Sequence, residues 1–300
     1  MDEFEVVVIG GGAAGLNAAL VLGRARRRVA VVDGGAPRNA PAEHMHGYLS
    51  RDGQSPAELV KLGREEIAGY GVTLIEDQVA AVTAGFQLRL ASGRTLNARK
   101  LIVATGLVDG LPDIPGMAER WGRDVLHCPY CHGYEVADQP LGVLGAGPLS
   151  VHVALLVRQW TDDLVFFSHT YELSDVDRAR LRARDIRVEP GEVTGLAVDG
   201  DRLQAVKLAD RRAVTRSALF VKGELTPRDE VLTALGCVRG EHGFVPVDGD
   251  GRTSVPGLYA VGNVVNPKAF VITAAAMGAT AAVAVNGELV EEAVLEGMSR

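Results

Sequence analysis

The feature of this sequence that most constrains its fold is a glycine-rich turn close to the start. The segment "EVVVIGGGAAG" is a run of β-branched residues followed by Gly10, Gly12 and Gly15 in the spacing G-x-G-x-x-G. Such a run is typical of a parallel strand that is buried on both faces. In the turn, the first glycine lets the chain reverse, the second lets a pyrophosphate approach the backbone, and the third lets the next helix pack against the strand. The segment therefore predicts a dinucleotide-binding turn.

The elements after this turn complete a nucleotide-binding unit. A helix is predicted over residues 13–22, with its N-terminal N–H groups facing the phosphates. A second strand, "RVAVVD", ends at Asp33, where a carboxylate can bind a ribose hydroxyl. A later strand, "RKLIVATG", closes with Ala104, Thr105 and Gly106. These small residues indicate another close approach of the backbone to a ligand.

The same pattern recurs in the middle of the chain. The segment "QPLGVLGAGPLSVHVALLV" predicts strand, turn and helix, with Gly145 and Gly147 as the first two glycines and Ser150 in the third place. Near the end, "LYAVGNV" predicts a strand that closes at Gly262 and Asn263, followed by an alanine-rich helix. We therefore predict an α/β fold with two Rossmann-type, three-layer nucleotide-binding domains, the second inserted into the first. The first domain would comprise residues 1–111 and 244–300, and the inserted domain residues 112–243.

Composition and charge exclude several classes of function. The net charge is −7, and the one basic run, "RARRR", stands at a predicted helix end, so no face suits nucleic acid. No apolar run reaches the ~18 residues of a membrane span, and the acidic N-terminus enters a strand at once, unlike a signal peptide. Three cysteines do not make a secreted disulfide framework. We expect a cytoplasmic protein with no nucleic-acid or membrane partner.

Four motifs in a fixed order carry a resemblance to a known family. They are "GGGAAG", "ATG", "CPYC" and "YAVGNV", the last followed by a helix of small residues. In this order they resemble the low-molecular-weight thioredoxin reductase family of FAD-dependent pyridine nucleotide-disulfide oxidoreductases, over nearly the whole chain. The resemblance implies FAD in the first domain, and a redox disulfide with NADPH in the inserted domain. It also implies a homodimer in which one domain swings against the other.

The resemblance transfers the flavin contacts of the family onto this chain with some departures. The positions that match are Gly10, Gly12, Ala13, Ala14, Gly15, Asp33, Gly34, Val79, Ala104, Thr105 and Gly106. The family's Gly-Asp near the ribityl chain is here Gly262 and Asn263, and its Arg-Gln before the last helix is replaced by Ala269, Phe270 and Val271. Backbone N–H groups at that helix start can still stabilise a reduced flavin. His46, in a loop with His44, is a further candidate for the flavin site, or an ordinary loop histidine.

The segment "LHCPYCHGYE" places Cys128 and Cys131 in a C-x-x-C spacing. Zinc needs four ligands, but Cys237 stands alone and the neighbouring histidines adjoin the existing pair, so we predict no metal site. Two nearby sulfurs suit a redox disulfide, and the alternative is a pair of inert buried thiols. By the resemblance, Cys128 exchanges with the substrate and Cys131 passes the electron pair to or from the flavin.

A general acid–base is expected beside the two cysteines. The family usually has aspartate after the second cysteine, and this chain has His132. Histidine can accept or donate a proton near neutral pH. The alternative is an ordinary surface histidine in a turn, and His127 and Glu135 are weaker candidates for the role.

The second nucleotide turn departs from the family pattern. The family's His-Arg-Arg, whose arginines bind the 2′-phosphate of NADPH, is here His169, Thr170 and Tyr171. No acid stands at this strand end to select NADH, and Pro148 and Leu149 occupy the turn that begins with Gly145 and Gly147. The identity of the nicotinamide donor, NADPH or NADH, therefore stays open.

Three functions remain on these grounds. The first is a thioredoxin reductase-like enzyme that passes electrons from NAD(P)H through FAD and the cysteine pair to a small-molecule or protein disulfide. The second is a nicotinamide-independent dithiol oxidase that uses dioxygen, as in a branch of the family that closes disulfides in sulfur-containing natural products, or a reductase that takes electrons from another donor. The third is a flavoprotein redox sensor without turnover.

Overall fold

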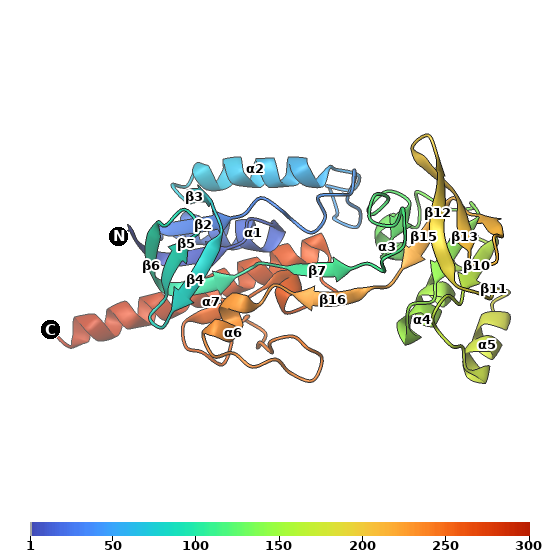
Figure 1. The fold of residues 1–300 in the computed structure, drawn as a ribbon. Helices are drawn as coiled ribbons and strands as arrows, with labels where there is room; N and C mark the ends of the chain where they lie inside the picture. Colours follow the sequence, from blue (N-terminus) through green and yellow to red (C-terminus); the bar gives the residue numbers. More distant parts are fainter. Residues whose placement is uncertain (1) are drawn as a thin grey trace. The chain divides into compact units, whose positions relative to one another are not determined.

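The computed structural model describes residues 2–300 and divides them into two compact units. The first unit comprises the chain up to Ala40, Gln54–Val108 and Thr226–Arg300, and the second comprises Pro41–Gly53 and Asp109–Leu225. Each unit contains a parallel sheet with helices (Figure 1), so the predicted α/β class with two Rossmann-type domains is confirmed. The strands β7 (Leu107–Gly110) and β16 (Glu224–Pro227) pair with each other where the chain passes between the units.

The boundaries differ from the predicted ones in two places. The first unit resumes at Thr226 rather than near residue 244. The short helix α6 (Glu230–Ala234) explains this, because Leu232 and the nearby Cys237 are buried in the core of the first unit's sheet. The segment Pro41–Gly53, expected in the first domain, belongs to the second unit.

The first unit is built on a sheet in the order β3-β2-β1-β6-β5-β4, with β17 also paired to β6. Its parallel strands are β1 (Asp2–Ile9), β2 (Val29–Asp33), β3 (Thr73–Glu76), β6 (Thr95–Val103) and β17 (Leu258–Ala260). Its antiparallel extension is β4 (Val79–Thr83) and β5 (Gln87–Leu90). The central strands are buried on both faces, as their β-branched sequences predict.

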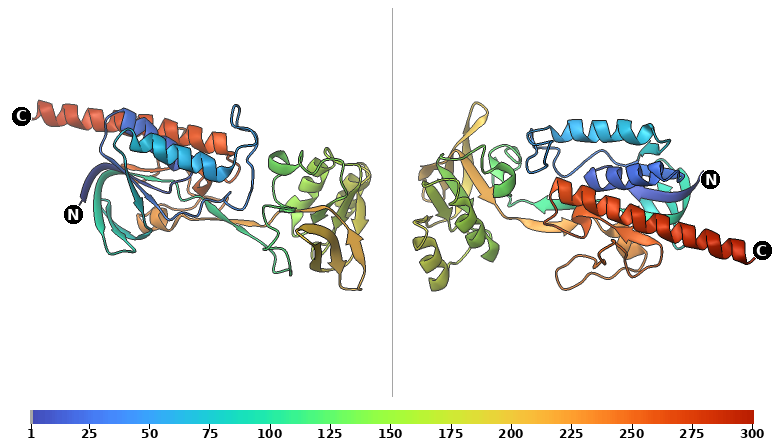
Figure 2. Two further views of the ribbon diagram at one scale, coloured as in Figure 1. Left: turned by 90° about the horizontal axis from the view of Figure 1, so that it is seen from above. Right: turned by 180° about the vertical axis from the view of Figure 1, so that it is seen from behind.

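Besides the short α6, the helices of this unit include α1 (Ala13–Arg24), α2 (Pro56–Ala68) and α7 (Val271–Met298). Helices α1 and α7 lie side by side (Figure 2) because small residues let their backbones approach. A Cβ atom added to Gly278 of α7 would lie 2.0 Å from the carbonyl oxygen of Ala14. This close packing brings the start of the first helix and the C-terminal segment of the chain together.

The second unit contains a parallel sheet in the order β11-β10-β9-β15-β8. The strands are β8 (Val125–Leu126), β9 (Leu141–Leu144), β10 (Leu164–Phe167), β11 (Arg187–Glu189) and β15 (Ala218–Val221). Its helices are α3 (Pro129–His132), α4 (Pro148–Val157) and α5 (Asp175–Arg182). An antiparallel sheet of β12 (Val193–Asp199), β13 (Arg202–Leu208) and β14 (Ala213–Thr215) completes the unit.

Helix α7 is long and apolar enough to cross a membrane, and within residues 2–300 it is the one helix that meets this test. The test considers length and composition alone, and the core helix of a soluble protein passes it as well. Ala275, Gly278, Ala281 and Leu289 on one face of α7 are buried in the protein.

Candidate active site

The glycine turn of the first unit has the shape that a phosphate group needs. Gly10 has a φ of +108°, and a Cβ atom there would lie 2.4 Å from the carbonyl oxygen of Ala104. A Cβ atom on Gly15 would lie 1.9 Å from the carbonyl oxygen of Gly10. Both positions therefore require glycine. Next to Gly12, in contrast, no atom lies within 4 Å of an added Cβ, so the turn has an open side that a ligand can approach.

The carboxylate of Asp33 lies against this turn at the end of β2. A Cβ atom on Gly11 would lie 2.4 Å from Asp33 Oδ2, and the Asp33 residue is 8% exposed. Arg64 of α2 donates a hydrogen bond of 2.6 Å to Oδ2, and the Gly35 amide donates one of 3.2 Å to Oδ1. Asp33 is thus held in place beside the glycine turn, where an acid binds the ribose of a dinucleotide. Sequence analysis had not singled out Arg64.

The small-residue turn after β6 is tied to a segment more than a hundred residues later. Thr105 Oγ1 donates a 2.5 Å hydrogen bond to the carbonyl oxygen of Arg228, and the Arg228 amide donates one of 3.0 Å to the carbonyl oxygen of Gly106. Arg228 also donates to the carbonyl oxygen of Ala36, in the loop after β2. The segment around Arg228 therefore belongs to the same site, although no motif in the sequence predicts this.

The predicted adenine contact lies next to the end of β2. Val79 opens β4, and the carbon chain of the preceding Gln78 lies 3.1 Å from the position of a Cβ atom on Gly34. The structure therefore brings Gly34 and Val79 to the same edge of the sheet as Asp33, as the resemblance implies.

Gly262 and Asn263 join the glycine turn from the C-terminal part of the chain. They lie in the short helix η1 (Gly262–Val264), and a Cβ atom on Gly262, whose φ is +75°, would lie 3.1 Å from the Cβ atom of Ala14. The side-chain amide of Asn263 donates to the carbonyl oxygens of Asn266 at 3.0 Å and Ala269 at 3.1 Å. A carboxylate cannot donate these bonds at neutral pH, which explains why asparagine serves here in place of the family's aspartate.

The start of α7 presents backbone N–H groups without a side-chain cap. Phe270 is the N-cap residue in an extended conformation, it makes no capping hydrogen bond through its side chain, and Val271 begins the helix. The first-turn amides of this 28-residue helix carry the positive end of its dipole. Together with the open glycine turn and Asp33, this end fits the phosphates, ribose and ring of FAD.

The two predicted redox cysteines form a disulfide in the second unit. The Cys128–Cys131 bond joins Cα atoms 5.2 Å apart. Cys128 is the N-cap residue of α3, and its carbonyl oxygen accepts hydrogen bonds from the amides of Cys131 and His132. Tyr130, between the cysteines, packs edge-on against Trp160 with ring centroids 5.6 Å apart. The disulfide is therefore set in a short, well-anchored turn.

The third cysteine does not join this pair. Cys237 is a free thiol, 4% exposed, and is buried in the core of the first unit. Within residues 2–300, no three His, Cys, Asp or Glu side chains lie close enough together to hold a metal ion.

His132 has the properties of a proton acceptor. Burial lowers its pKa, the carboxylate of Glu135 raises it, and His46 lowers it, with a net shift below the ordinary value for histidine. A neutral imidazole therefore follows Cys131 at neutral pH. His46 Nε2 lies 3.2 Å from Glu135 Oε1, and His46 Nδ1 lies 3.4 Å from Asp52 Oδ2. The structure thus places His46 in the unit of the disulfide.

The second glycine turn has open space beside Gly147, but fewer of its backbone N–H groups are available to a ligand. A Cβ atom on Gly145 would lie 2.6 Å from the carbonyl oxygen of Ser168, and Gly147 is open. Ser150, 1% exposed, accepts a 3.1 Å hydrogen bond from the Ala146 amide through its Oγ atom. Pro148, the first residue of α4, has no N–H group. Two of the backbone donors that a pyrophosphate would use are therefore occupied or missing.

The polar groups at the end of β10 are also bonded within the protein. His169 accepts a 3.0 Å hydrogen bond from the Val193 amide through Nδ1, and burial lowers the pKa of its imidazole. The Tyr171 hydroxyl donates a 3.1 Å hydrogen bond to Asp177. On the neighbouring strand, Glu189 forms an ion pair with Arg212. No arginine occupies the positions where the family binds the 2′-phosphate of NADPH.

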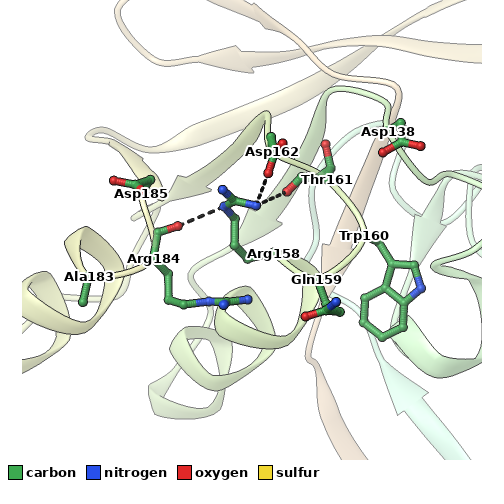
Figure 3. Close-up of a pocket in the computed structure, with 9 residues that line it drawn as sticks. All are labelled: Asp138, Arg158, Gln159, Trp160, Thr161, Asp162, Ala183, Arg184 and Asp185. Carbon is green, nitrogen blue, oxygen red and sulfur yellow. Dashed lines mark hydrogen bonds and ion pairs between the residues drawn. The ribbon is translucent and has the colours of Figure 1, made fainter.

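The second unit also has a hollow of about 400 Å³ (Figure 3), and it lies at the amino ends of the strands, away from the glycine turn. Its lining includes Arg158 and the residues just before β10, whereas Rossmann-type sheets bind nucleotides at the carboxyl ends of their strands. Arg158 donates to the carbonyl oxygens of Arg184 and Thr161, and it pairs with Asp162. Because these bonds occupy the guanidinium of Arg158, it does not replace the missing arginines.

Comparison with known proteins agrees with this site. A family model described as pyridine nucleotide-disulphide oxidoreductase matches residues 4–294. Thioredoxin reductase tcpT of Claviceps purpurea (strain 20.1) is 32% identical over 275 residues, which cover 86% of each chain. Thioredoxin reductase sirT of Leptosphaeria maculans is 31% identical over 306 residues, which cover 94% of this chain and 93% of its own. The crystal structure of HlmI is 55% identical with a TM-score of 0.97, over 99% of this chain and 96% of that one.

Proposed function

The chain belongs to the pyridine nucleotide-disulphide oxidoreductase family, and from that premise we propose that Cys128 and Cys131 pass an electron pair between a thiol or disulfide substrate and FAD. The enzyme is thioredoxin reductase-like, as the sequence predicted. The observation that carries the proposal is the combination of a C-x-x-C disulfide in one unit with an open glycine turn in the other. The substrate is a small molecule or a protein that contains a dithiol or disulfide.

Each residue of the flavin site has a role that follows from its position. The amides around Gly12 bind the pyrophosphate, Asp33 binds the adenosine ribose, and Gly262 leaves room beside Ala14. The amides at the start of α7 stabilise negative charge on the ring. When bound there, FAD supplies the two-electron redox chemistry.

The cysteine pair and His132 carry out the exchange with the substrate. A neutral His132 accepts the proton of a substrate thiol, and the resulting thiolate attacks Cys128 Sγ. The Cys128–Cys131 bond breaks, and Cys131 leaves as a thiolate. In the opposite direction the same steps reduce a substrate disulfide.

The proposal is tested by anaerobic reduction of the purified holoprotein with NADPH, NADH and dithiothreitol in parallel, with flavin absorbance as the readout. We expect bleaching by at least one of these donors. In the variants Cys128→Ser and Cys131→Ser, FAD stays bound but thiol–disulfide turnover falls by on the order of a thousandfold or more. Full turnover in Cys131→Ser would contradict the relay.

A second candidate function, a nicotinamide-independent dithiol oxidase, is favoured by the state of the second glycine turn. The Ala146 amide donates its hydrogen bond to Ser150, and Pro148 has no N–H group to donate. Thr170 and Tyr171 stand at the positions where arginines would bind NADPH. In such an oxidase, dithiothreitol alone bleaches the flavin and dioxygen restores its colour. Rapid bleaching by NADPH or NADH instead establishes the reductase.

We further propose that the protein works as a homodimer in the cytoplasm. The homodimer is supported by an apolar stripe on the exposed face of α7, which includes Val283, Val290 and Val294. A redox-active cysteine pair that cycles between dithiol and disulfide is the kind that reducing compartments retain.

A further inference from the structure

The loop Pro41–Gly53 brings a histidine and a carboxylate to the redox turn. This loop belongs to the second unit, Met45 anchors it at 5% exposure, and the Gly53 amide donates to the Met45 carbonyl oxygen. The Gly47 amide donates a 2.8 Å hydrogen bond to Asp52 Oδ1. These contacts hold the residues on both sides of His46, Met45 and Gly47.

His46 lies between two carboxylates. Its Nε2 atom is buried and lies 3.2 Å from Glu135 Oε1, while its Nδ1 atom lies 3.4 Å from Asp52 Oδ2. Glu135 follows His132 by three residues, and both Glu135 and His46 act electrostatically on the His132 imidazole. Four titratable side chains from two segments of the chain thus form one cluster, and its member His132 directly follows Cys131.

We propose that Glu135 and His46 extend His132 into an acid–base relay that takes up the second proton released in thiol–disulfide exchange. This inference rests on the proposed function. His132 directly follows Cys131 in the chain, and Glu135 and His46 are positioning residues that act through it.

The exchange releases two protons when both cysteines leave as thiolates. The first substrate thiol loses its proton to His132, its sulfur bonds to Cys128, and Cys131 leaves as a thiolate. The second substrate thiol then loses its proton, its sulfur closes the substrate disulfide, and Cys128 leaves as a thiolate. Two electrons have moved from substrate to cysteine pair, and two protons have left the substrate. One imidazole holds one of these protons, and the His46–Glu135 pair provides the place for the other.

The charges around the cluster favour this role. Glu135 raises the pKa of His132 and so stabilises its protonated form, against burial and His46, which lower it. Hydrogen bonds from Gly47 and His46 lower the pKa of Asp52, which stays a carboxylate at neutral pH. The His46 imidazole therefore has a carboxylate on each side, Asp52 at Nδ1 and Glu135 at Nε2.

The test uses the anaerobic holoprotein with dithiothreitol as the probe. The variants are Glu135→Gln and His46→Gln, and the matched control is His44→Gln, because His44 lies in the same loop and contacts the Gly53 carbonyl oxygen instead. Reduction of the cysteine pair is followed by rapid alkylation and mass spectrometry, and flavin bleaching by stopped flow, from about pH 5 to about pH 9.

We expect Glu135→Gln and His46→Gln to slow reduction of the cysteine pair by on the order of tenfold, and the control to react as the wild type does. In Glu135→Gln, the acid limb of the pH profile moves to lower pH, because the carboxylate that favours protonated His132 is gone. Glu135→Asp should restore part of the rate. The Glu135 side chain is 39% exposed, so its variants test the relay even where His46→Gln does not fold.

Wild-type rates and pH profiles in both variants would overturn the relay, and so would slower reduction with an unchanged profile. A wild-type disulfide that dithiothreitol does not reduce, with no bleaching by any donor, would instead overturn the proposed function. The two failures are therefore distinguishable.

Discussion

At the scale of single residues, the glycines of the first turn are required for two different reasons. Some are required by the fold of the protein, and Gly12 is required by the bound cofactor. Gly10 and Gly15 are needed by the protein itself, because a Cβ atom at either would overlap the backbone. Gly12 has a φ of −81° and open space beside it, so a side chain there meets no protein atom. Only a bound ligand would collide with it.

We therefore predict that Gly12→Val folds normally but loses FAD. Its affinity for FAD should fall by at least about tenfold, while the thermal stability of the cofactor-free protein changes by less than about 1 kcal/mol. Flavin fluorescence titration and thermal melting measure the two quantities. Gly249→Val is the control, because Gly249 also has nothing within 4 Å and should keep its FAD. Wild-type affinity in Gly12→Val would place the pyrophosphate elsewhere.

The sequence predicted the residues of the site that lie within a motif, and it missed those that reach the site by tertiary contact. The glycine turns, Asp33 and the C-x-x-C pair follow from local spacing. Arg64 bonds to Asp33 across 31 positions, and Arg38 bonds to Asn263 at 3.3 Å across 225 positions. Such pairs depend on how the strands are ordered in the sheet, and no local pattern encodes that order.

At the scale of elements, the same dependence on tertiary contacts explains why the predicted boundaries of the two units differ from the observed ones. Helix α6 has five residues, too few to show helical periodicity, so its place in the first unit was missed. The loop Pro41–Gly53 contains no helix or strand, and its sequence does not indicate which unit it packs on. The long, strongly patterned elements, β1, α1 and α7, were predicted correctly.

Ion pairs and hydrogen bonds centred on Glu288 hold helix α7 against the sheet of the first unit. Lys100, 7% exposed, pairs with Glu288 at 2.9 Å and Glu292 at 2.6 Å. The Tyr259 hydroxyl donates a 2.5 Å hydrogen bond to Glu288, and Arg252 donates one of 3.0 Å. Burial raises the pKa of Glu288, but these hydrogen bonds outweigh it and lower the pKa from 4.5 to about 2.

This depressed pKa predicts how the stability of the first unit depends on pH. The carboxylate's contribution is fully present above a pH of about 4.5, the unfolded value, and is lost as the pH falls toward about 2. Glu288→Gln should lower the free energy of unfolding by about 1–3 kcal/mol at neutral pH, and this difference should shrink as the pH falls through that window.

Urea unfolding followed by circular dichroism at several pH values measures this effect. Glu296→Gln is the control, because Glu296 lies on the same helix, is more exposed, and is 3.4 Å from Arg99. A difference between wild type and Glu288→Gln that stays constant through the acid window would contradict the assignment.

At the scale of the whole molecule, the two Rossmann-type units have different degrees of adaptation to nucleotides. The first turn is open at Gly12 and has an acid at the end of the next strand. The second turn repeats the strand, turn and helix, yet its Ala146 amide and the polar groups of Tyr171 and Glu189 are bonded to protein. A repeated fold therefore does not imply a repeated ligand.

The exposed face of α7 gives the whole molecule an interface that a second copy can use. Its exposed large apolar residues follow helical spacing from Val283 through Val290 and Val294 to Met298, with exposed fractions of 64%, 46%, 48% and 79%. Exposed apolar residues on one helix face are typical of an interaction site. In the proposed homodimer, each copy would contribute the same helix face to a symmetric interface.

We predict that the double variant Val290→Glu, Val294→Glu is a monomer. Each glutamate would place a charge in the centre of the contact, where burying it costs several kcal/mol, so dimers should dissociate. Light scattering after gel filtration should give the mass of one chain, 31.7 kDa, for the variant and twice that mass for the wild type. Val176→Glu, at a more exposed valine of α5, is the control and should stay dimeric. A wild-type protein with the mass of one chain would show that a different partner, or none, covers this face of α7.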